Sequence, residues 1–436
     1  MKNKEIRERS IAVFVRALLG TAVGCICTAQ AADFGATIDV GVGYSDNIDT
    51  APDDLAIEEK MGTVGLNLLY FEDTRRFDAD VLADVMYVDY LDNTFDNDVI
   101  GNARGDVTLG LMPERFQWQI SDNFGQIRTN RFSPVSPTNR ENINVFSTGP
   151  DLLFRLGARN GVRLSARYGR TDFETSVQDE ESRRGSIALT RELSGGSTAA
   201  LIGETAQYDF TQATFADFDR HNLYLNYETA GARTTLGVDV GYTIVDFGDE
   251  DSDGVLGRLR LTRRVSAAST IAFGLGTSFS ASGDVFRNTQ RRLSGRDDAQ
   301  LTLAVSDVFW RRSVDVGWTF ARARTALTLT VLYSNDTYEH QTDFNRELMV
   351  TSLEVRRELG RNSSFDLGAR YNDEEFDSGI DSKTLRLSAG FAWQVGQHIV
   401  LSLRGIRYDR SSHQVNTQYE ENQGWFTVGY RMGQSQ

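Results

Sequence analysis

The stretch Thr235–Ile244 reads Thr-Leu-Gly-Val-Asp-Val-Gly-Tyr-Thr-Ile, and its polar and apolar residues alternate strictly. The apolar positions are Leu236, Val238, Val240, Tyr242 and Ile244, and the intervening positions are Thr235, Gly237, Asp239, Gly241 and Thr243. Successive side chains of a β-strand point to opposite faces. The stretch therefore predicts a strand with one wholly apolar face and one small or polar face.

About twenty segments of the chain repeat this alternation, and no helical period interrupts them. They run from Ile38–Tyr44 through Val64–Tyr70, Phe77–Tyr87, Ala103–Leu111, Phe116–Ile120, Leu152–Leu156, Val162–Tyr168, Ile187–Leu193, Ser197–Tyr208 and Leu223–Tyr227 to Thr235–Ile244, and then through Val255–Leu261, Ile271–Phe279, Leu301–Val305, Leu327–Tyr333, Met349–Val355, Phe365–Tyr371, Leu385–Val395 and Ile399–Leu403 to Phe426–Met432. The segment Val314–Phe320 also alternates, but out of phase with Leu301–Val305. An even strand count requires it to merge with a neighbour, which gives about twenty strands, with eighteen acceptable.

The connections between these segments fall into two classes. Every second one is tight, as at Glu72–Arg75, Met112–Glu114 and Ser194–Gly196. The intervening ones are longer and more acidic, as at Ser45–Lys60, Gly125–Asn144 and Ser282–Asp298. Short turns on one rim and long loops on the other are typical of a transmembrane β-barrel. We therefore predict an all-β fold, a single antiparallel up-and-down transmembrane barrel.

The first thirty residues have the features of an export signal. A basic region with Lys2, Lys4 and Arg16 precedes a short apolar run, and Ala29-Gln30-Ala31 has the small-x-small form of a cleavage site. We expect a signal peptide over residues 1–31, cleaved after Ala31 or Ala32, and a barrel over residues 32–436. These features predict an integral protein of the Gram-negative outer membrane, in contact with lipid and lipopolysaccharide.

Composition limits the chemistry of the mature chain. Both cysteines, Cys25 and Cys27, lie inside the signal, so disulfides and thiolate ligands are excluded. Without the signal's five basic and two acidic residues, the chain keeps 41 basic and 59 acidic residues, a net charge of −18. Such a charge argues against a nucleic-acid partner. Beyond the signal only Lys60 and Lys383 are lysines, so nearly all the positive charge is arginine, which pairs with carboxylates in a fixed geometry.

The ends of the predicted strands carry aromatic residues. Tyr44, Tyr70, Tyr87, Tyr168, Tyr242, Tyr333, Tyr371 and Trp393 lie at or near the end of an apolar face. Amphipathic rings prefer the membrane interface, so we expect these residues to form an aromatic girdle. The last strand, Phe426–Met432, resembles the C-terminal strand that the barrel-insertion machinery recognises, although the chain ends on Gly-Gln-Ser-Gln.

Charged residues occupy the faces that the strand phase turns away from lipid. Arginine at mid-bilayer costs about 2–4 kcal/mol, so these residues must line the lumen. The predicted lumen residues are Arg104, Arg155, Arg163, Arg167, Arg258, Arg260, Arg370 and Arg386, with Asp78, Asp80, Asp84 and Asp239, and the same phase includes Arg184, Arg404, Asp106 and Asp315. They form either structural Arg–carboxylate networks or a positively lined conduit, densest at Arg163, Arg167, Arg258 and Arg260, for an anionic solute or polymer.

Signals for catalysis, metals or cofactors are weak. The four histidines have no metal-ligand spacing, and no nucleophile or phosphate-loop motif occurs. The loop from Asp249 to Gly254 copies the first half of a calcium loop, but Arg260 stands where the bidentate Glu belongs. We therefore interpret it as a solvated hairpin tip and expect no cofactor and no enzyme, although a spatial Ser/His/carboxylate cluster at the rim would be compatible with one.

One segment goes beyond the general barrel pattern. Residues 136–156, Ser136-Pro-Thr-Asn-Arg-Glu-Asn-Ile-Asn-Val-Phe-Ser-Thr-Gly149-Pro-Asp-Leu-Leu-Phe-Arg-Leu156, resemble a segment of the EpsL-type outer-membrane barrels, which are associated with exopolysaccharide and PEP-CTERM/exosortase systems. Gly43-Tyr-Ser-Asp46-Asn47 and Tyr90-Leu-Asp92 fit the same pattern. The resemblance implies a role in exporting or assembling a secreted polysaccharide, with the polysaccharide and its export complex as partners, and supplies no catalytic residues.

The sequence thus favours a passive conduit or accessory in exopolysaccharide export. A general diffusion porin is the runner-up, and Gly125–Asn144 is the one obvious candidate for a loop folded into the lumen. A barrel that only anchors a complex ranks third, and an outer-membrane enzyme ranks last.

Overall fold

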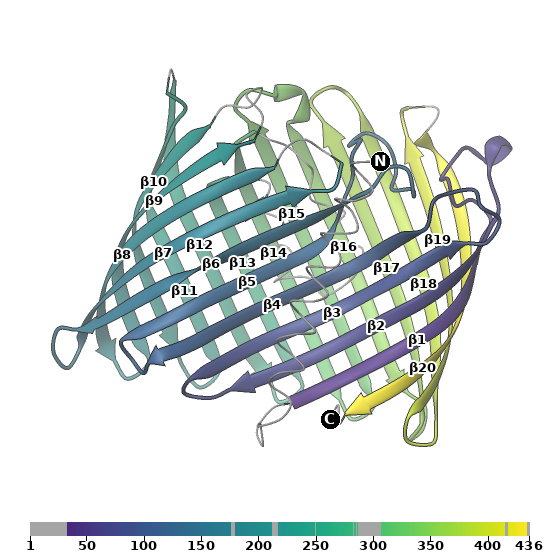
Figure 1. Cartoon of the computed structure of the whole chain (residues 1–436), viewed down its shortest axis with the longest axis horizontal. Coiled ribbons are helices and arrows are strands. Elements are labelled where there is room, and N and C mark those ends of the chain that lie inside the picture. The colour runs from purple at the N-terminus through teal and green to yellow at the C-terminus, as the bar shows by residue number, and fades with distance from the viewer. Residues whose placement is uncertain are drawn as a thin grey trace.

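Twenty antiparallel strands form one closed sheet, which the computed structural model describes over residues 33–175, 179–211, 217–248, 250–281, 283–284, 286, 307–414 and 417–433 (Figure 1). The strands are β1 (Asp33–Ser45), β2 (Glu59–Asp73), β3 (Phe77–Tyr90), β4 (Asp98–Met112), β5 (Phe116–Ile127), β6 (Glu141–Arg155), β7 (Asn160–Phe173), β8 (Glu180–Ser194), β9 (Ser197–Phe210), β10 (Phe218–Ala230), β11 (Thr234–Asp246), β12 (Asp251–Ser266), β13 (Ser269–Ser280), β14 (Phe309–Arg322), β15 (Thr325–Tyr338), β16 (Arg346–Glu358), β17 (Ser363–Phe376), β18 (Asp381–Val395), β19 (Ile399–Ser412) and β20 (Tyr419–Gly433). Two short 3₁₀ turns, η1 (Asp53–Leu55) and η3 (Thr342–Phe344), lie in the connections.

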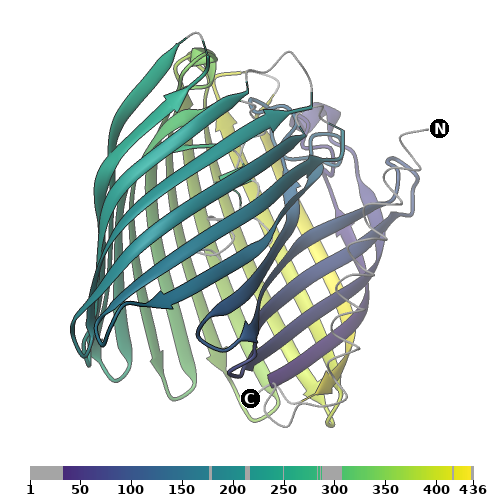
Figure 2. The same ribbon diagram turned by 60° about the vertical axis from the view of Figure 1, so that its left-hand side comes forward.

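Each strand pairs with its neighbours in sequence, and β1 pairs with β20 from Gly35↔Gly433 to Ser45↔Gln423. This last pairing closes the sheet, so no strand edge is left open, as a membrane requires. The strands tilt around the wall in the same sense (Figure 2). The predicted all-β up-and-down barrel of about twenty strands is confirmed. Recognition of β20 by the insertion machinery stays a prediction.

The connections separate the barrel into two rims. Nine connections of two to four residues, such as 74–76 and 195–196, define the short-turn rim, where β1 begins and β20 ends. Ten connections of four to twenty-eight residues, such as 46–58, 128–140 and 281–308, define the long-loop rim. The predicted sorting of the connections is therefore present, although 247–250 and 377–380 are no longer than the longest short turns.

The alternation of β11 separates the two faces of the wall. Val240, Tyr242 and Ile244 are 57%, 46% and 44% exposed on the outer face, whereas Asp239 and Thr243 are buried on the inner face. The pattern continues around the sheet, because residues paired across neighbouring strands share a face. Leu225, which pairs with Val240, and Leu275, which pairs with Leu259, are also exposed on the outer face. The outer surface is thus an apolar belt suited to lipid.

One predicted merger of strands was wrong. Val314–Phe320 lies inside β14, a separate strand that pairs directly with β13. Its phase fits that neighbour, because Val314 faces Leu275 and Val316 faces Phe273. The misleading comparison was with Leu301–Val305, which lies outside the described residues. Twenty strands are reached with Val314–Phe320 as a strand of its own.

Most of the predicted girdle residues occupy the outer face. Tyr44, Tyr87, Tyr168, Tyr242, Tyr333 and Trp393 are each between 38% and 49% exposed there. Hydroxyl groups of this set reach polar partners on the neighbouring strand or loop: Tyr242 donates to Asp253, and Tyr87 accepts from the Asn97 amide. Tyr70 differs, because it is only 5% exposed and its hydroxyl is held by Glu72. No helix among the described residues is long and apolar enough to span a membrane.

Candidate functional site

The inner face of β11 and β12 places two arginines on one carboxylate. Asp239 is paired in register with Arg258, and its Oδ2 lies 3.8 Å from Arg258 Nη1 and 3.5 Å from Arg260 Nη1. The Asn226 amide on β10 donates to the other Asp239 oxygen at 2.7 Å. The carboxylate is buried, whereas the two guanidinium groups are 39% and 47% exposed. Arg260 Nη2 also lies 3.8 Å from Glu228 Oε1, so the two arginines share two carboxylates while their guanidinium groups stay accessible from the lumen.

A second network joins β3 and β4. Arg104 Nη2 lies 2.6 Å from Asp80 Oδ2, and Arg104 Nε lies 3.9 Å from Asp106 Oδ2. Asp78 and Asp84 lie on the same face of β3 as Asp80, because they are two and four residues away from it. Here carboxylates outnumber arginines, so this part of the inner wall is a braced network without surplus positive charge.

Arg167 on β7 is fixed by several acceptors. Its Nη2 donates to Asp151 Oδ1 at 2.6 Å and to Gln119 Oε1 at 2.7 Å, and its Nη1 donates to the Pro150 carbonyl at 2.9 Å. Asp151 and Pro150 belong to the segment 136–156 that carries the family resemblance. That segment therefore supplies two of the acceptors that orient Arg167, and Gln119 of β5 supplies a third.

The remaining predicted lumen residues are not gathered into one cluster. Arg155 lies at the short-turn rim beside Glu114, at 3.1 Å and 76% exposed. Arg163 is exposed on the face of β7 that also carries Arg167. Arg370 Nε donates to Asn372, and Arg386 Nε donates to the Tyr408 hydroxyl, each at 3.1 Å.

A cavity of about 1040 Å³ occupies the barrel interior beside β4 to β16. Six arginines line it, against four carboxylates: Arg167, Arg184, Arg220, Arg258, Arg260 and Arg311, with Asp106, Glu204, Asp284 and Asp315. Threonines and serines from β12 to β15 supply hydroxyl groups on one side, among them Thr262, Thr270, Ser313, Thr319, Thr328 and Thr330. We call this space the Arg-lined cavity. Four of these arginines also pair with Asp151, Asp239 or Asp336, which do not line the cavity, so guanidinium groups outnumber carboxylates only among the side chains that face it. Such a lining suits an anionic, hydroxyl-bearing guest.

The connection of residues 128–140, which we call the cross-lumen loop, runs from β5 and β6 to strands far away in the wall. Arg128 Nη2 donates to both carboxylate oxygens of Glu374 on β17, at 2.8 and 3.0 Å. Arg410 on β19 donates to the Phe132 carbonyl at 3.5 Å. The loop thus bridges the barrel interior near the long-loop rim, within the range Gly125–Asn144 predicted for a lumen loop.

The anchor of this loop continues into a buried chain of charges. Glu374 also accepts from Arg346 Nη1 at 2.9 Å, and Arg346 Nη2 donates to Asp336 at 2.9 Å. Asp336 in turn accepts two hydrogen bonds from Arg311, both at 2.6 Å. Arg346 and Asp336 are almost fully buried. Buried charges lose their hydration, so this row of charged side chains is stable only because each of them has a partner of opposite charge.

Aromatic contacts support the same docking. The Arg131 guanidinium lies 3.5 Å from the centre of the Phe344 ring, and Phe132 packs edge-on against Phe376 at 5.0 Å. Burial there lowers the pKa of the Arg131 side chain to about 10. The loop is therefore seated by cation–π, aromatic and ionic contacts together.

Asn139 organises the interior of the loop. Its amide nitrogen donates to the carbonyls of Asn130, Ser133 and Pro134, and its Oδ1 accepts from the Asn130 backbone and the Thr129 hydroxyl. One side chain thus satisfies five polar groups of an otherwise irregular segment. Asn139 lies in the segment on which the family resemblance rests.

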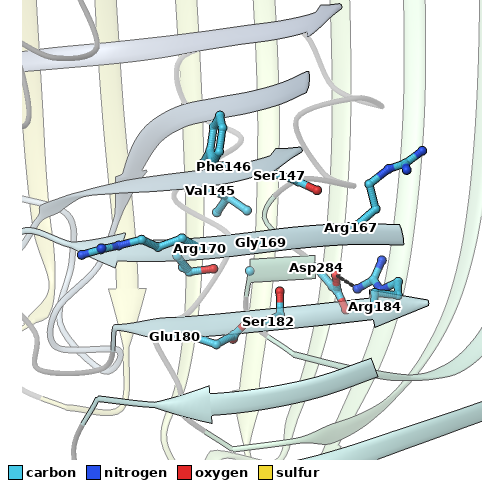
Figure 3. A pocket seen from close by; sticks show the side chains of 12 residues that line it. Val145, Phe146, Ser147, Arg167, Gly169, Arg170, Glu180, Ser182, Arg184 and Asp284 are labelled. Atoms are coloured by element: carbon cyan, nitrogen blue, oxygen red, sulfur yellow. Dashed lines mark hydrogen bonds and ion pairs between the residues drawn. The ribbon is translucent and has the colours of Figure 1, made fainter. Parts of the chain in front are cut away.

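A second segment enters the interior after β13. Its described residues are Ala281, Gly283, Asp284 and Phe286, which we call the Asp284 segment. Asp284 points toward Arg184 (Figure 3), with Oδ1 at 3.1 Å from Arg184 Nη2. Phe286 packs into a fully buried cluster with Ile127, Ile143 and Val145. Gly283 passes close to β7, because an added Cβ would lie 2.6 Å from Thr171 Oγ1.

Sequence reasoning missed most of these partners. Arg220, Arg311, Arg346, Asp336 and Glu374 follow the inward phase of their strands, so extending the alternation toward the long-loop ends could have found them. Asp284 lies in a connection, and no local signal gives its destination. The calcium-like loop is not assembled as one, because Asp251 and Asp253 belong to β12, while Asp249 lies outside the described residues. Among the residues described, no group of three or more metal-ligating side chains occurs.

The closed wall, the apolar belt and the tyrosines at its margin define a transmembrane β-barrel of the type found in bacterial outer membranes. The sequence matches no protein-family model, and no curated protein matches it. Similar solved structures include a ferric enterobactin receptor (PfeA) of Pseudomonas aeruginosa, with 9% identity and a TM-score of 0.44 over 93% of this chain and 81% of that one. The siderophore receptor PirA of the same organism has 11% identity and a TM-score of 0.42, over 92% and 81% of the two chains. Pseudomonas aeruginosa OccK2 (OpdF) has 11% identity and a TM-score of 0.38, over 93% and 98%.

Proposed function

We propose that this protein is a passive outer-membrane conduit for an anionic polymer or solute and serves as an accessory in exopolysaccharide export. The observation that carries the proposal is the Arg-lined cavity, in which six arginines face four carboxylates. Fixed rings of guanidinium groups select anions in pores. The resemblance of residues 136–156 to the EpsL-type barrels supplies the polysaccharide part of the proposal.

A general diffusion porin is the second candidate, and the cross-lumen loop favours it. A loop that bridges the lumen narrows the pore and limits the size of the solutes that pass, but it does not by itself select a particular solute. The two functions differ in how they treat polymers. A porin passes small neutral and charged solutes, whereas a polymer conduit binds a polyanion along its length.

Planar bilayers test the proposal. We expect oligogalacturonate, an acidic glycan, to block the ionic current of the purified protein at concentrations where neutral dextran of similar length does not. Block by neither glycan, together with free permeation of small neutral sugars, would support the porin instead. Unchanged secreted polysaccharide after deletion of the gene would contradict the export role.

A further inference from the structure

Three strands of the wall converge on the carboxylate of Asp284. Arg184 of β8, Tyr208 of β9 and Arg220 of β10 point inward from neighbouring positions near the long-loop rim. The Tyr208 hydroxyl donates to Asp284 Oδ2 at 2.9 Å, and Arg220 Nη1 donates to the same oxygen at 3.2 Å. Arg184 donates to the other oxygen, so the Asp284 carboxylate accepts from three side chains that the adjacent strands β8, β9 and β10 hold in place.

The donors are themselves fixed. Tyr208 and Arg220 are 1% and 7% exposed, and the Tyr208 ring stacks on Phe218 at 4.4 Å. Arg184 Nη2 also donates to the Tyr208 hydroxyl at 3.0 Å. Glu204 lies 3.7 Å from Arg220 and is the second carboxylate of the neighbourhood. Because two guanidinium groups converge here, the cluster is arranged around an anion.

The cluster has hydrogen-bond donors to spare. The Nε atoms of both Arg184 and Arg220 are buried and have no acceptor among the described residues. Buried donors of this kind are costly unless a partner reaches them. Asp284, a single carboxylate, leaves both unsatisfied, whereas a guest with further oxygen atoms could accept from them.

The carboxylate itself does not belong to the wall. Asp284 comes from a connection, whereas its three donors come from adjacent strands. Arg184, Arg220 and Asp284 all line the Arg-lined cavity, so a solute in that cavity reaches the cluster directly. An anion that enters the cavity therefore competes with Asp284 for the same donors.

We infer that Arg184, Tyr208 and Arg220 form a binding site for the carboxylate of a sugar acid, and that Asp284 occupies this site as an internal competitor. This site rests on the proposed function, because a ligand can reach it only through the lumen. A sugar acid fits because its carboxylate matches the three donors and its hydroxyl groups can accept from the spare Nε atoms. The threonines and serines of the Arg-lined cavity offer further partners to a longer chain of such sugars.

Calorimetric titration of the full-length protein in detergent with sodium galacturonate tests this inference, and it does not depend on transport. A tethered group has an effective concentration on the order of millimolar. If the Asp284 carboxylate has an intrinsic Kd for these donors on the order of 0.1 mM, removing it tightens the binding of an added carboxylate about tenfold. We therefore expect Asp284→Ala to bind galacturonate about tenfold more tightly than the wild type, and galactose to bind neither protein.

Matched variants make the result specific. Asp366→Asn removes the charge of a carboxylate on β17 that does not line this cavity and lies 3.6 Å from Arg404, and it should leave the affinity unchanged. Arg220→Gln in the Asp284→Ala background should abolish binding, and Arg184→Gln, in a less buried position, should weaken it if Arg220→Gln fails to fold. Equal affinities of the wild type and Asp284→Ala, absence of binding to both, or binding insensitive to both arginine variants would each overturn the inference. Tight binding without block of current in bilayers would instead contradict only the conduit.

Discussion

Removing the Arg128 side chain should release the cross-lumen loop while leaving the barrel wall intact. Arg128 is the loop's ionic contact with β17, with a guanidinium 2.8 and 3.0 Å from the two oxygens of Glu374. Glu374 keeps Arg346 as a partner at 2.9 Å in the Arg128→Ala variant, so no buried carboxylate is left alone. The perturbation is therefore confined to the loop side of the charge chain.

The size of the effect follows from the two lost hydrogen bonds. Each hydrogen bond to a charged group contributes about 1.5–3 kcal/mol when buried, so the loop loses about 3 kcal/mol of docking free energy at the lower bound. At about 1.4 kcal/mol for each factor of ten, the ratio of docked to released loop falls roughly a hundredfold. The released state, in which the lumen is not bridged, should therefore be populated up to about a hundredfold more often.

Single-channel recording in planar bilayers measures this change. We expect Arg128→Ala to show a larger conductance, or longer openings, than the wild type. The control is Lys60→Ala, which breaks an exposed ion pair with Asp92 at 3.8 Å close to the long-loop rim and should change nothing measurable. Identical traces for Arg128→Ala and the wild type, with both proteins folded, would refute the placement of this loop in the conduction path.

Three further predictions concern the wall, the loop and the lumen charges. Val240→Arg places a charge on the lipid face of β11 at a cost of about 2–4 kcal/mol and should block assembly, whereas Val240→Leu should not. Heat-modifiable migration in electrophoresis distinguishes folded from unfolded barrels. Normal assembly of the arginine variant would contradict the orientation of β11. Asn139→Ala removes a side chain that satisfies five polar groups and should make the cross-lumen loop sensitive to limited proteolysis without lowering barrel yield; Asn97→Ala, at a more exposed site, is its control. Glu374→Ala removes the carboxylate that pairs with both Arg128 and Arg346, and it should lower the free energy of unfolding by about 3–5 kcal/mol, more than Arg128→Ala does. Equal stability of the two variants in urea would show that Arg128 and Arg346 do not both depend on Glu374.

The inner and outer faces of the barrel wall could be predicted from the sequence because the alternation of side chains along a strand is a local property. In β11, each residue's face depends only on whether its position is odd or even, and Val240 and Asp239 therefore separate without knowledge of any neighbour. The same rule indicated Arg258 and Arg260 as inner residues. It could not say that both would approach Asp239, because that depends on the register between β11 and β12.

The interior of the barrel could not be predicted in the same way. Arg128 and Glu374 are 246 residues apart in the sequence, and Asp284 is a hundred residues from Arg184. The contacts within these two pairs depend on the closure of the barrel and on the path of irregular connections. The misplaced merger of Val314–Phe320 has a related cause. A period of two shows that Val314–Phe320 alternates, but it does not show which other alternating segment is its neighbour in the sheet.

An anion conduit requires the guanidinium groups that face the lumen to attract a passing solute more strongly than the carboxylates repel it. The most direct test is the reversal potential of Arg128→Ala channels under a potassium chloride gradient, compared with the same channels carrying Arg167→Gln, Arg258→Gln and Arg260→Gln. Selectivity for chloride over potassium that these three substitutions abolish is the expected result. Selectivity for potassium, or a reversal potential that the substitutions leave unchanged, would contradict an anion conduit lined by these arginines.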